Sequence, residues 1–289
     1  MGRIVHGHAF EGRLRFSAVN MKDVVEEARL RHSLSPVATA ALGRALSAAA
    51  LAIPWLAETE TLTMDFDTLG PIGRIVAQSR GNFTVRGYVS NPSVEGSVKD
   101  GKFEVSKIVV GGTLRVVRDL GLKTPYVSQV PIISGEIAQD IAYYYASSEQ
   151  IPTAIVLGVL VGKKGVLEAG GYALQVLDRS IGEEKLEELE KRVREIGAIT
   201  SHLRRGETIE DVLSLVLGEE FGDYSEGTVK FRCSCSREKA FQSLLVLRIE
   251  ELEEMKEEGF AEVTCKWCGK RYIFDEDDLE LAIMEKRGR

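Results

Sequence analysis

The pattern of hydrophobic and polar residues near the start of the chain predicts a strand followed by helices. Residues 13–19 alternate polar and apolar side chains, which is typical of a half-buried strand. Asn20 then offers a cap for a helix. Ser35 with Pro36 predicts the start of a second helix, because serine is a favoured N-cap and proline fits the first helical turn. The alanine-rich run that ends at Ala50 indicates that this second helix packs closely against its neighbours.

Short strand-like segments dominate the region that follows, and clusters of turn residues separate them. They span residues 61–67, 72–79, 83–89, 113–117, 153–161 and 166–176, and one further helix is expected to begin at Ser134. Strands gathered with a few helices, without regular alternation of strand and helix, predict an α+β fold.

After residue 178 the pattern becomes helical and strongly charged. Residues 183–196 place apolar side chains at intervals of three and four on one face. Thr208 and Asp211 have the spacing of a capping box, and the apolar residues 212–217 follow them. Because the apolar stripe is narrow, these helices need a neighbour that covers it.

The chain of 289 residues therefore divides into three expected parts. Residues 1–178 form an α+β core domain, residues 179–226 form a helical linker, and residues 227–289 form a C-terminal domain that carries every cysteine.

The overall charge is acidic, with 44 Asp and Glu against 37 Lys and Arg and a formal net charge of −7. A protein that binds nucleic acid through its phosphates is normally basic, so we expect no nucleic acid partner. The N-terminal residues contain no apolar run typical of a signal peptide, and the apolar residues 45–57 are too few to span a membrane. We expect a cytoplasmic protein without a membrane partner, whose thiols stay reduced.

The cysteines form two close pairs, Cys233 with Cys235 and Cys265 with Cys268, separated by the 29 residues from 236 to 264. Four thiolates at such a spacing predict one tetrahedral Zn²⁺ site. Four thiolates around one Zn²⁺ leave a net charge of about −2. We expect nearby cations to offset it: Arg232, Arg237, Lys266, Lys270 and Arg271. A helix over residues 240–254 is predicted between the pairs, and a strand over 272–274 after them.

A site of four cysteines is structural in most proteins, but two features favour a switchable site here. Neighbouring thiols can join each other once a metal leaves. Zinc also holds them as thiolates, the reactive form, among basic residues. The spacing alone leaves both interpretations open.

Several segments resemble the redox-regulated 33-kilodalton heat-shock chaperones. The cysteine pairs lie in residues 229–238 (VKFRCSCSRE) and 262–268 (EVTCKWC), which match that family's signature, with Trp267 in place of the more usual Phe. Residues 135–144 (GEIAQDIAYY), 148–150 (SEQ) and 169–172 (AGGY) are similar to further blocks of the family in the same order. The resemblance covers nearly the whole chain.

The resemblance implies a holdase, which binds unfolding client proteins without ATP and prevents their aggregation under oxidative and heat stress. It implies that the reduced, zinc-bound form is inactive. Oxidation then releases zinc, forms the disulfides Cys233–Cys235 and Cys265–Cys268, and gives an active homodimer. Loss of zinc would also free the apolar linker residues, the expected client-binding set: Leu186, Leu189, Val193, Ile196, Leu213, Leu215 and Leu217.

Two other classes of protein remain as alternatives. A nucleic-acid-binding zinc ribbon is opposed by the acidic composition and by the lack of a basic, aromatic strand surface. An enzyme with a structural zinc tail is opposed by the lack of a nucleophile–base or phosphate-binding motif in the first 178 residues. His6 and His8 have a spacing seen in metal sites, but no acidic partner pattern accompanies them, so we expect a strand-end or surface role for both.

Overall fold

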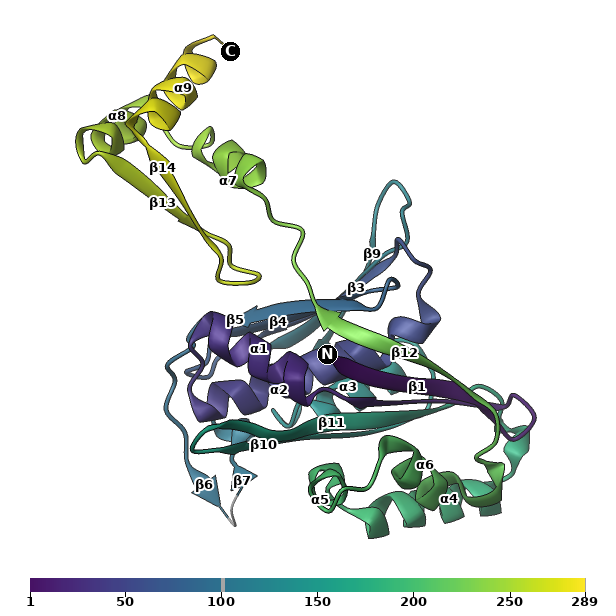
Figure 1. Ribbon diagram of the computed structural model, residues 1–289. Coiled ribbons are helices and arrows are strands. Elements are labelled where there is room, and N and C mark those ends of the chain that lie inside the picture. Colours follow the sequence, from purple (N-terminus) through teal and green to yellow (C-terminus); the bar gives the residue numbers. More distant parts are fainter. Residues whose placement is uncertain (100–101, 289) are drawn as a thin grey trace. The chain divides into compact units, whose positions relative to one another are not determined.

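The computed structural model describes residues 1–99 and 102–288. It divides into two compact units, Met1–Arg232 and Cys233–Arg289, which we describe separately. Both units mix helices and strands (Figure 1), so the predicted α+β class is confirmed.

One mixed sheet of ten strands organises the first unit, in the order β10-β11-β2-β1-β12-β5-β4-β3-β8-β9. Neighbouring strands run antiparallel, except that β12 pairs with β5 in parallel. The strands are β1 (Gly2–Ala9), β2 (Leu14–Asn20), β3 (Thr61–Asp67), β4 (Arg74–Arg80), β5 (Thr84–Val89), β8 (Thr113–Asp119), β9 (Tyr126–Pro131), β10 (Thr153–Gly162), β11 (Gly165–Val176) and β12 (Tyr224–Phe231). A small separate hairpin joins β6 (Val98–Lys99) and β7 (Lys102–Phe103).

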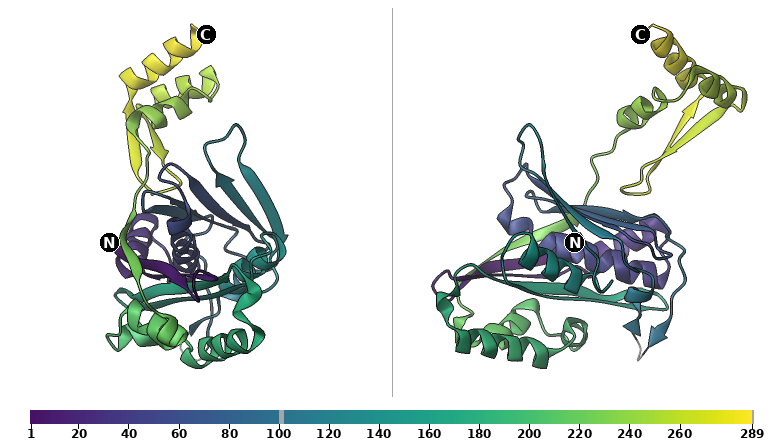
Figure 2. Two further views of the ribbon diagram at one scale, coloured as in Figure 1. Left: turned by 90° about the vertical axis from the view of Figure 1, so that its right-hand side faces the viewer. Right: turned by 180° about the vertical axis from the view of Figure 1, so that it is seen from behind.

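Three helices fill the inner side of this curved sheet: α1 (Lys22–His32), α2 (Pro36–Leu51) and α3 (Ala138–Ser147). Helix α2 begins as predicted, with the Ser35 hydroxyl accepting a hydrogen bond from the Ala38 amide. It packs against β4 and β5 on one side and against β10 and β11 on the other (Figure 2). Helix α3 begins later than expected, because Ser134 and its neighbours form a turn around the buried Asp140 carboxylate.

The segment Pro36–Trp55 is long and apolar enough to cross a membrane by length and composition, and 89% of the apolar window is buried inside the protein. Such burial is typical of the core helix of a soluble domain. This agrees with the expectation of a buried helix in this region.

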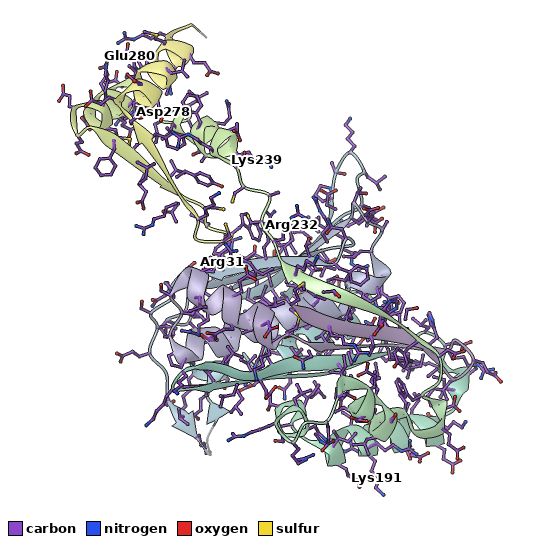
Figure 3. The ribbon with its side chains drawn as sticks, in the orientation of Figure 1. Arg31, Lys191, Arg232, Lys239, Asp278 and Glu280 are labelled. Carbon is purple, nitrogen blue, oxygen red and sulfur yellow. The ribbon has the colours of Figure 1, made fainter. Side chains whose placement is uncertain are left out.

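The predicted linker forms three helices, α4 (Glu183–Ile196), α5 (Ile199–Arg204) and α6 (Ile209–Leu217), below the β1–β2–β11 part of the sheet (Figure 1). Both hydrogen bonds of the Thr208–Asp211 capping box are present. The outer face of α4 is charged, and Lys191 points away from the sheet (Figure 3). The inner faces share one hydrophobic cluster with β1, β2 and β11, so the core sheet is the neighbour that these helices require.

The chain returns from α6 to the core sheet before it reaches the cysteines. Strand β12 pairs with β1 from Gly2–Val229 to Gly7–Tyr224, and its last residues pair with β5. The predicted start of the C-terminal domain at residue 227 lies inside β12, whereas the second compact unit begins at Cys233. The sequence of β12 is mainly polar and gives no strong strand pattern, so its long-range pairing was not predicted.

The second unit contains α7 (Arg237–Leu244), α8 (Ile249–Glu257), β13 (Phe260–Thr264), β14 (Arg271–Asp275) and α9 (Glu276–Arg287). The prediction of one helix over residues 240–254 is wrong, since the chain turns after Leu244 and restarts at Arg248, which caps α8. The strand predicted at 272–274 is confirmed within β14. The small core of this unit includes Leu244, Leu252, Phe274, Leu279 and Ile283.

Candidate metal centre

Two loops bring the four cysteines together within the second unit. Cys233 and Cys235 precede α7, whose N-cap is Ser236. Cys265 and Cys268 lie in the turn between β13 and β14, where the Cys265 amide donates to the Lys270 carbonyl at 2.9 Å. The Gly269 amide donates back to the Cys265 carbonyl at 2.8 Å, and Gly269 has a φ of +70°, which glycine adopts without strain.

The sulfur atoms have the spacing that one tetrahedral metal ion requires. All four Sγ atoms lie within 4.8 Å of one another, and the four cysteines are not joined by disulfides. The Sγ atoms of Cys233 and Cys265 are 3.8 Å apart, and those of Cys235 and Cys268 are 3.4 Å apart. A Zn–S bond of about 2.3 Å in a tetrahedron gives sulfur separations of about 3.8 Å. The four cysteines thus form a site that fits a thiolate-bound metal ion.

The thiols differ in their surroundings. Burial raises the pKa of Cys265 and Cys268 and favours their neutral form. Burial also opposes ionisation of Cys235, but a hydrogen bond from the Tyr272 hydroxyl and the neighbouring thiols outweigh it and lower the pKa of Cys235 to about 7. Cys235 therefore ionises more readily than Cys265 and Cys268.

Two of the cations expected to offset the charge of the site are engaged elsewhere. The Arg237 guanidinium pairs with Asp278 of α9 and lies over the Phe274 ring. Arg271 pairs with Glu262 across the β13–β14 hairpin at 3.5 Å. Lys270 places its ammonium 4.9 Å from the centre of the Tyr272 ring, beside the residue that contacts Cys235.

The expected client-binding residues of the linker divide by burial. Leu189, Leu213 and Leu217 are buried in the cluster shared with the core sheet, and Leu186, Val193 and Ile196 pack against it partly buried. Leu215 points outward and is 51% exposed, because it lies on the opposite face of α6 from Leu213. Most of the set is thus covered by the core sheet in this structure.

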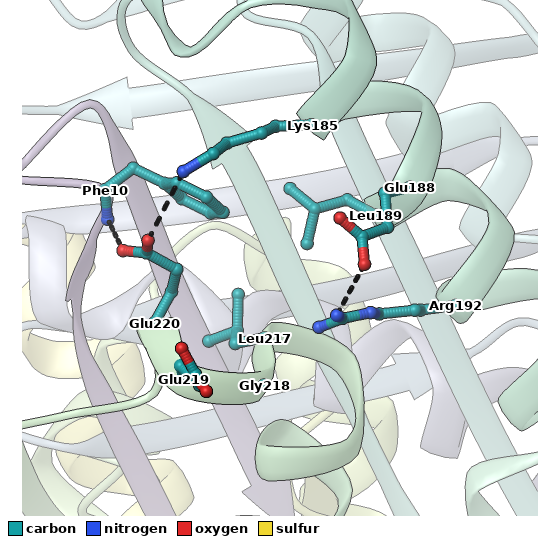
Figure 4. A pocket seen from close by; sticks show the side chains of 9 residues that line it. All are labelled: Phe10, Lys185, Glu188, Leu189, Arg192, Leu217, Gly218, Glu219 and Glu220. Carbon is teal, nitrogen blue, oxygen red and sulfur yellow. Dashed lines mark hydrogen bonds and ion pairs between the residues drawn. The ribbon is translucent and has the colours of Figure 1, made fainter.

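Polar contacts that the hydrophobic pattern does not reveal fasten the linker to the core. Arg3 of β1 pairs with Glu210 of α6 at 2.6 Å and with Glu226 of β12 at 2.8 Å. Glu220 accepts a hydrogen bond from the Phe10 amide at 3.1 Å and lies 3.7 Å from the Lys185 ammonium (Figure 4). These contacts join residues far apart in the sequence, so no local sequence motif predicts them.

A cavity of about 300 Å³ lies beside the Glu220 contact, between α4 and the tip of the β1–β2 hairpin (Figure 4). Leu189 and Leu217 form its apolar wall, and Arg192 closes one side, held by Glu188 at 2.6 Å. Gly218 has a φ of +62°, and a Cβ at this position would collide with the Arg192 guanidinium. The positive φ favours a glycine immediately after α6, whereas the Arg192 guanidinium is the end of a flexible side chain that can move aside.

His202 joins the three linker helices. Its Nε2 lies 3.0 Å from the Ile196 carbonyl at the end of α4, and its Nδ1 lies 2.7 Å from a Glu207 carboxylate oxygen ahead of α6. Arg205 also donates to Glu207 at 2.7 Å. The hydrogen bonds with His202 and Arg205 hold the pKa of Glu207 below its usual value.

The sign of the Glu207 shift predicts how the linker responds to pH. The ordinary pKa of a glutamate is 4.5, and that of folded Glu207 is lower, so its ionised carboxylate stabilises the fold fully above pH 4.5. This stabilisation is lost as the pH falls through the lower pKa of the folded state. We expect Glu207→Gln to lower the urea midpoint of unfolding at pH 7, and the difference from the wild type to vanish towards pH 3. Glu195→Gln on the exposed face of α4 is the matched control and should show no such difference; an equal effect in both variants would contradict the prediction.

His6 and His8 lie on β1, and both rings make edge contacts with Trp55, at centroid distances of 5.8 and 5.5 Å. Within the described residues, the side chains that cluster closely enough to hold a metal ion are those of the four cysteines, and neither histidine belongs to this cluster. His6 is partly exposed and His8 is exposed on β1, which agrees with the strand-end or surface role expected for them.

The fold and the cysteine site together define an α+β protein with a C-terminal unit whose four clustered cysteines fit a metal ion. The chain belongs to the Hsp33 family: it matches the family described as Hsp33 protein over residues 2–275. The match extends over both compact units and includes all four cysteines.

Several relatives are similar along their whole length. A 33 kDa chaperonin of Thermotoga maritima is 53% identical over 98% of both chains, and one of Thermus thermophilus is 44% identical over 99% of this chain and 88% of the relative. The crystal structure of the Thermotoga maritima protein, a 33 kDa chaperonin, superposes with a TM-score of 0.96 over 99% of both chains, at 52% identity. The resemblance noted in the sequence is thus confirmed.

Proposed function

We propose that the protein is a redox-regulated, ATP-independent holdase that protects unfolding proteins from aggregation under oxidative and heat stress. The observation that carries the proposal is the cluster of four cysteine sulfurs within 4.8 Å of one another, placed in a small unit of its own. Membership in a family whose relatives are named chaperonins supports the binding of unfolded clients. The role is one of binding and release rather than catalysis.

In this proposal Cys233, Cys235, Cys265 and Cys268 are the four ligands of one Zn²⁺ in the reduced state. Bound zinc would keep the sulfurs as thiolates and contribute folding energy to the second unit. The protein residues position the four sulfurs through the β13–β14 turn and the loop before α7. The donor set of four thiolates suits zinc better than magnesium or calcium, which prefer oxygen.

Oxidation by peroxide would act on each cysteine pair in two balanced steps. One thiolate attacks the peroxide, so that an S–O bond forms, the O–O bond breaks and hydroxide leaves. The second thiolate attacks the resulting sulfenic sulfur, so that the S–S bond forms and a second hydroxide leaves. Two electrons pass from the sulfurs to peroxide for each disulfide, Cys233–Cys235 and Cys265–Cys268.

Strand β12 supplies a route by which the loss of the cysteine site would reach the linker. It ends at Phe231, two residues before Cys233, and carries Glu226, which shares Arg3 with Glu210 of α6. If β12 loosens, Arg3 loses one of its two partners and α6 loses part of its hold on the core. Opening of α4–α6 would then expose apolar residues of the linker and of the sheet beneath it.

The proposal assigns a role to each part of the chain. Residues 1–178 would bind clients and dimerise, residues 179–226 would respond to redox state, and residues 227–289 would hold the switch. We place the protein in the cytoplasm, with unfolded proteins and, in the oxidised state, a second copy of itself as partners.

A light-scattering assay with a thermally unfolding client tests the proposal. We expect peroxide-treated protein to release its zinc and suppress aggregation, and reduced zinc-loaded protein to have little effect. Ser234→Ala is a suitable control variant, because Ser234 lies between two ligands without contributing a sulfur. If oxidation released zinc without suppressing aggregation, the holdase function would be wrong while the metal site stood.

A further inference from the structure

The Tyr272 hydroxyl contacts one sulfur of the cysteine cluster. Tyr272 lies on β14, paired with Val263 of β13, and is only 6% exposed. Its hydroxyl oxygen lies 3.1 Å from Cys235 Sγ. A thiolate offers no proton, so the hydroxyl must be the donor whenever Cys235 is ionised or bound to a metal.

The other pair of cysteines receives hydrogen bonds from the backbone instead. Cys265 Sγ accepts from the Trp267 amide, and Cys268 Sγ accepts from the Lys270 amide. Both donors belong to the β13–β14 turn, which places them by its own geometry. Cys235 lies in a different loop and accepts its hydrogen bond from the side-chain hydroxyl of Tyr272. The two residues are 37 positions apart in the sequence.

The position of Tyr272 makes this contact specific. Its ring belongs to the core cluster of the second unit, so the hydroxyl is held by packing and not by a flexible stem. Lys270 lies over the ring and places a positive charge beside the donor. A hydrogen bond to a ligand sulfur draws charge from it, which orients the ligand and lowers its nucleophilicity.

We propose that Tyr272 is a positioning residue that fixes Cys235 Sγ through its hydroxyl, and so slows both the loss of the metal from Cys235 and the attack of Cys235 on peroxide. This inference rests on the proposed function, because it concerns the reactivity of the same cysteine site. Without the hydroxyl, a sulfur lone pair is freed to form the S–O bond with peroxide, with the O–O bond breaking and hydroxide leaving as before.

The test uses the full-length, zinc-loaded protein with Tyr272→Phe, which removes the hydroxyl and retains the ring. Loss of such an outer contact typically weakens metal affinity by about 10–100-fold. We expect competition with a chromogenic chelator to show zinc affinity reduced by about tenfold or more. Mass spectrometry after brief alkylation should show an increased ratio of modified Cys235 to modified Cys268.

Two matched variants separate this role from a merely structural one. Thr264→Val removes a hydroxyl beside a ligand cysteine, but that hydroxyl lies 3.3 Å from Glu262 and not against a sulfur, so it should change neither measurement. Phe274→Leu disturbs the same buried core without removing a sulfur contact, so it should lower stability but leave the Cys235 to Cys268 ratio unchanged.

The inference is overturned if Tyr272→Phe keeps zinc affinity within twofold of the wild type with an unchanged ratio, or if Phe274→Leu shifts the ratio equally. A different result would contradict the proposed function. If wild-type protein retained its zinc under peroxide, the redox switch would be wrong, while the affinity of Tyr272→Phe would still decide the role of the hydroxyl.

Discussion

Removal of the proposed zinc is expected to unfold residues Cys233–Arg289 and to loosen α4–α6, while the core of the first unit around α2 stays folded. The second unit has 57 residues, and its small core centres on side chains such as Leu252, Phe274 and Leu279. Domains of this size bury little apolar surface and often need a metal or disulfides. A structural zinc site contributes about 10–16 kcal/mol of apparent binding free energy, which is as large as the stability of a whole domain.

Hydrogen exchange measured before and after chelation provides the test. Amides of α7, α8 and α9 should lose their protection when the metal is removed, while those of α2, buried in the first unit, should keep it. Cys268→Ser should reproduce the effect of chelation, and Ser234→Ala should not. Continued protection of α8 and α9 in the chelated protein would show that the packed core alone sustains the unit.

Much of the first unit could be predicted because its elements have strong local patterns. Strand β3 and helix α4 begin and end where the periodicity places them, and the Ser35 and Thr208 caps form the hydrogen bonds that their residue types predict. Strand β12 could not be predicted in this way. Its sequence is mainly polar, and it becomes a strand because β1 and β5, from the other end of the sequence, pair with it.

The helix between the cysteine pairs shows a different limit of sequence reasoning. Apolar residues recur from Phe241 to Leu252 at helical spacing, yet the chain turns between Leu244 and Arg248. The two shorter helices place Leu244 and Leu252 in one small core. Periodicity identifies the buried side chains correctly, but it does not show where a compact unit must bend the chain.

The metal site was visible in the sequence, whereas its supporting contacts were not. Cysteine pairs at short spacing identify their own chemistry, and the structure brings their sulfurs together as a tetrahedral ion requires. The contacts of Tyr272 with Cys235 and of Arg3 with Glu210 join distant segments through common residue types. Such contacts depend on the three-dimensional arrangement, and they are the ones that would control how readily the switch responds.

Leu213→Ala is expected to loosen the linker helices and to give client binding without oxidation. Leu213 is fully buried where α6 meets the core sheet, and truncation of a buried leucine typically costs about 2–5 kcal/mol. Helices α4, α5 and α6 share one hydrophobic cluster with β1, β2 and β11. The substitution therefore weakens the packing that holds the linker helices against the core sheet. Binding of a hydrophobic dye and suppression of client aggregation by the reduced protein measure the effect.

Leu215→Ala on the same helix is the matched control for Leu213→Ala. Leu215 is half-exposed and lies outside the shared cluster, so its truncation should change stability by less than about 0.5 kcal/mol and leave the reduced protein inactive. The pair also tests which linker residues bind clients. If Leu215→Ala weakened client binding by the oxidised protein while Leu213→Ala left the reduced protein closed, the exposed face of α6 would be the binding surface, and the buried face would serve only the fold.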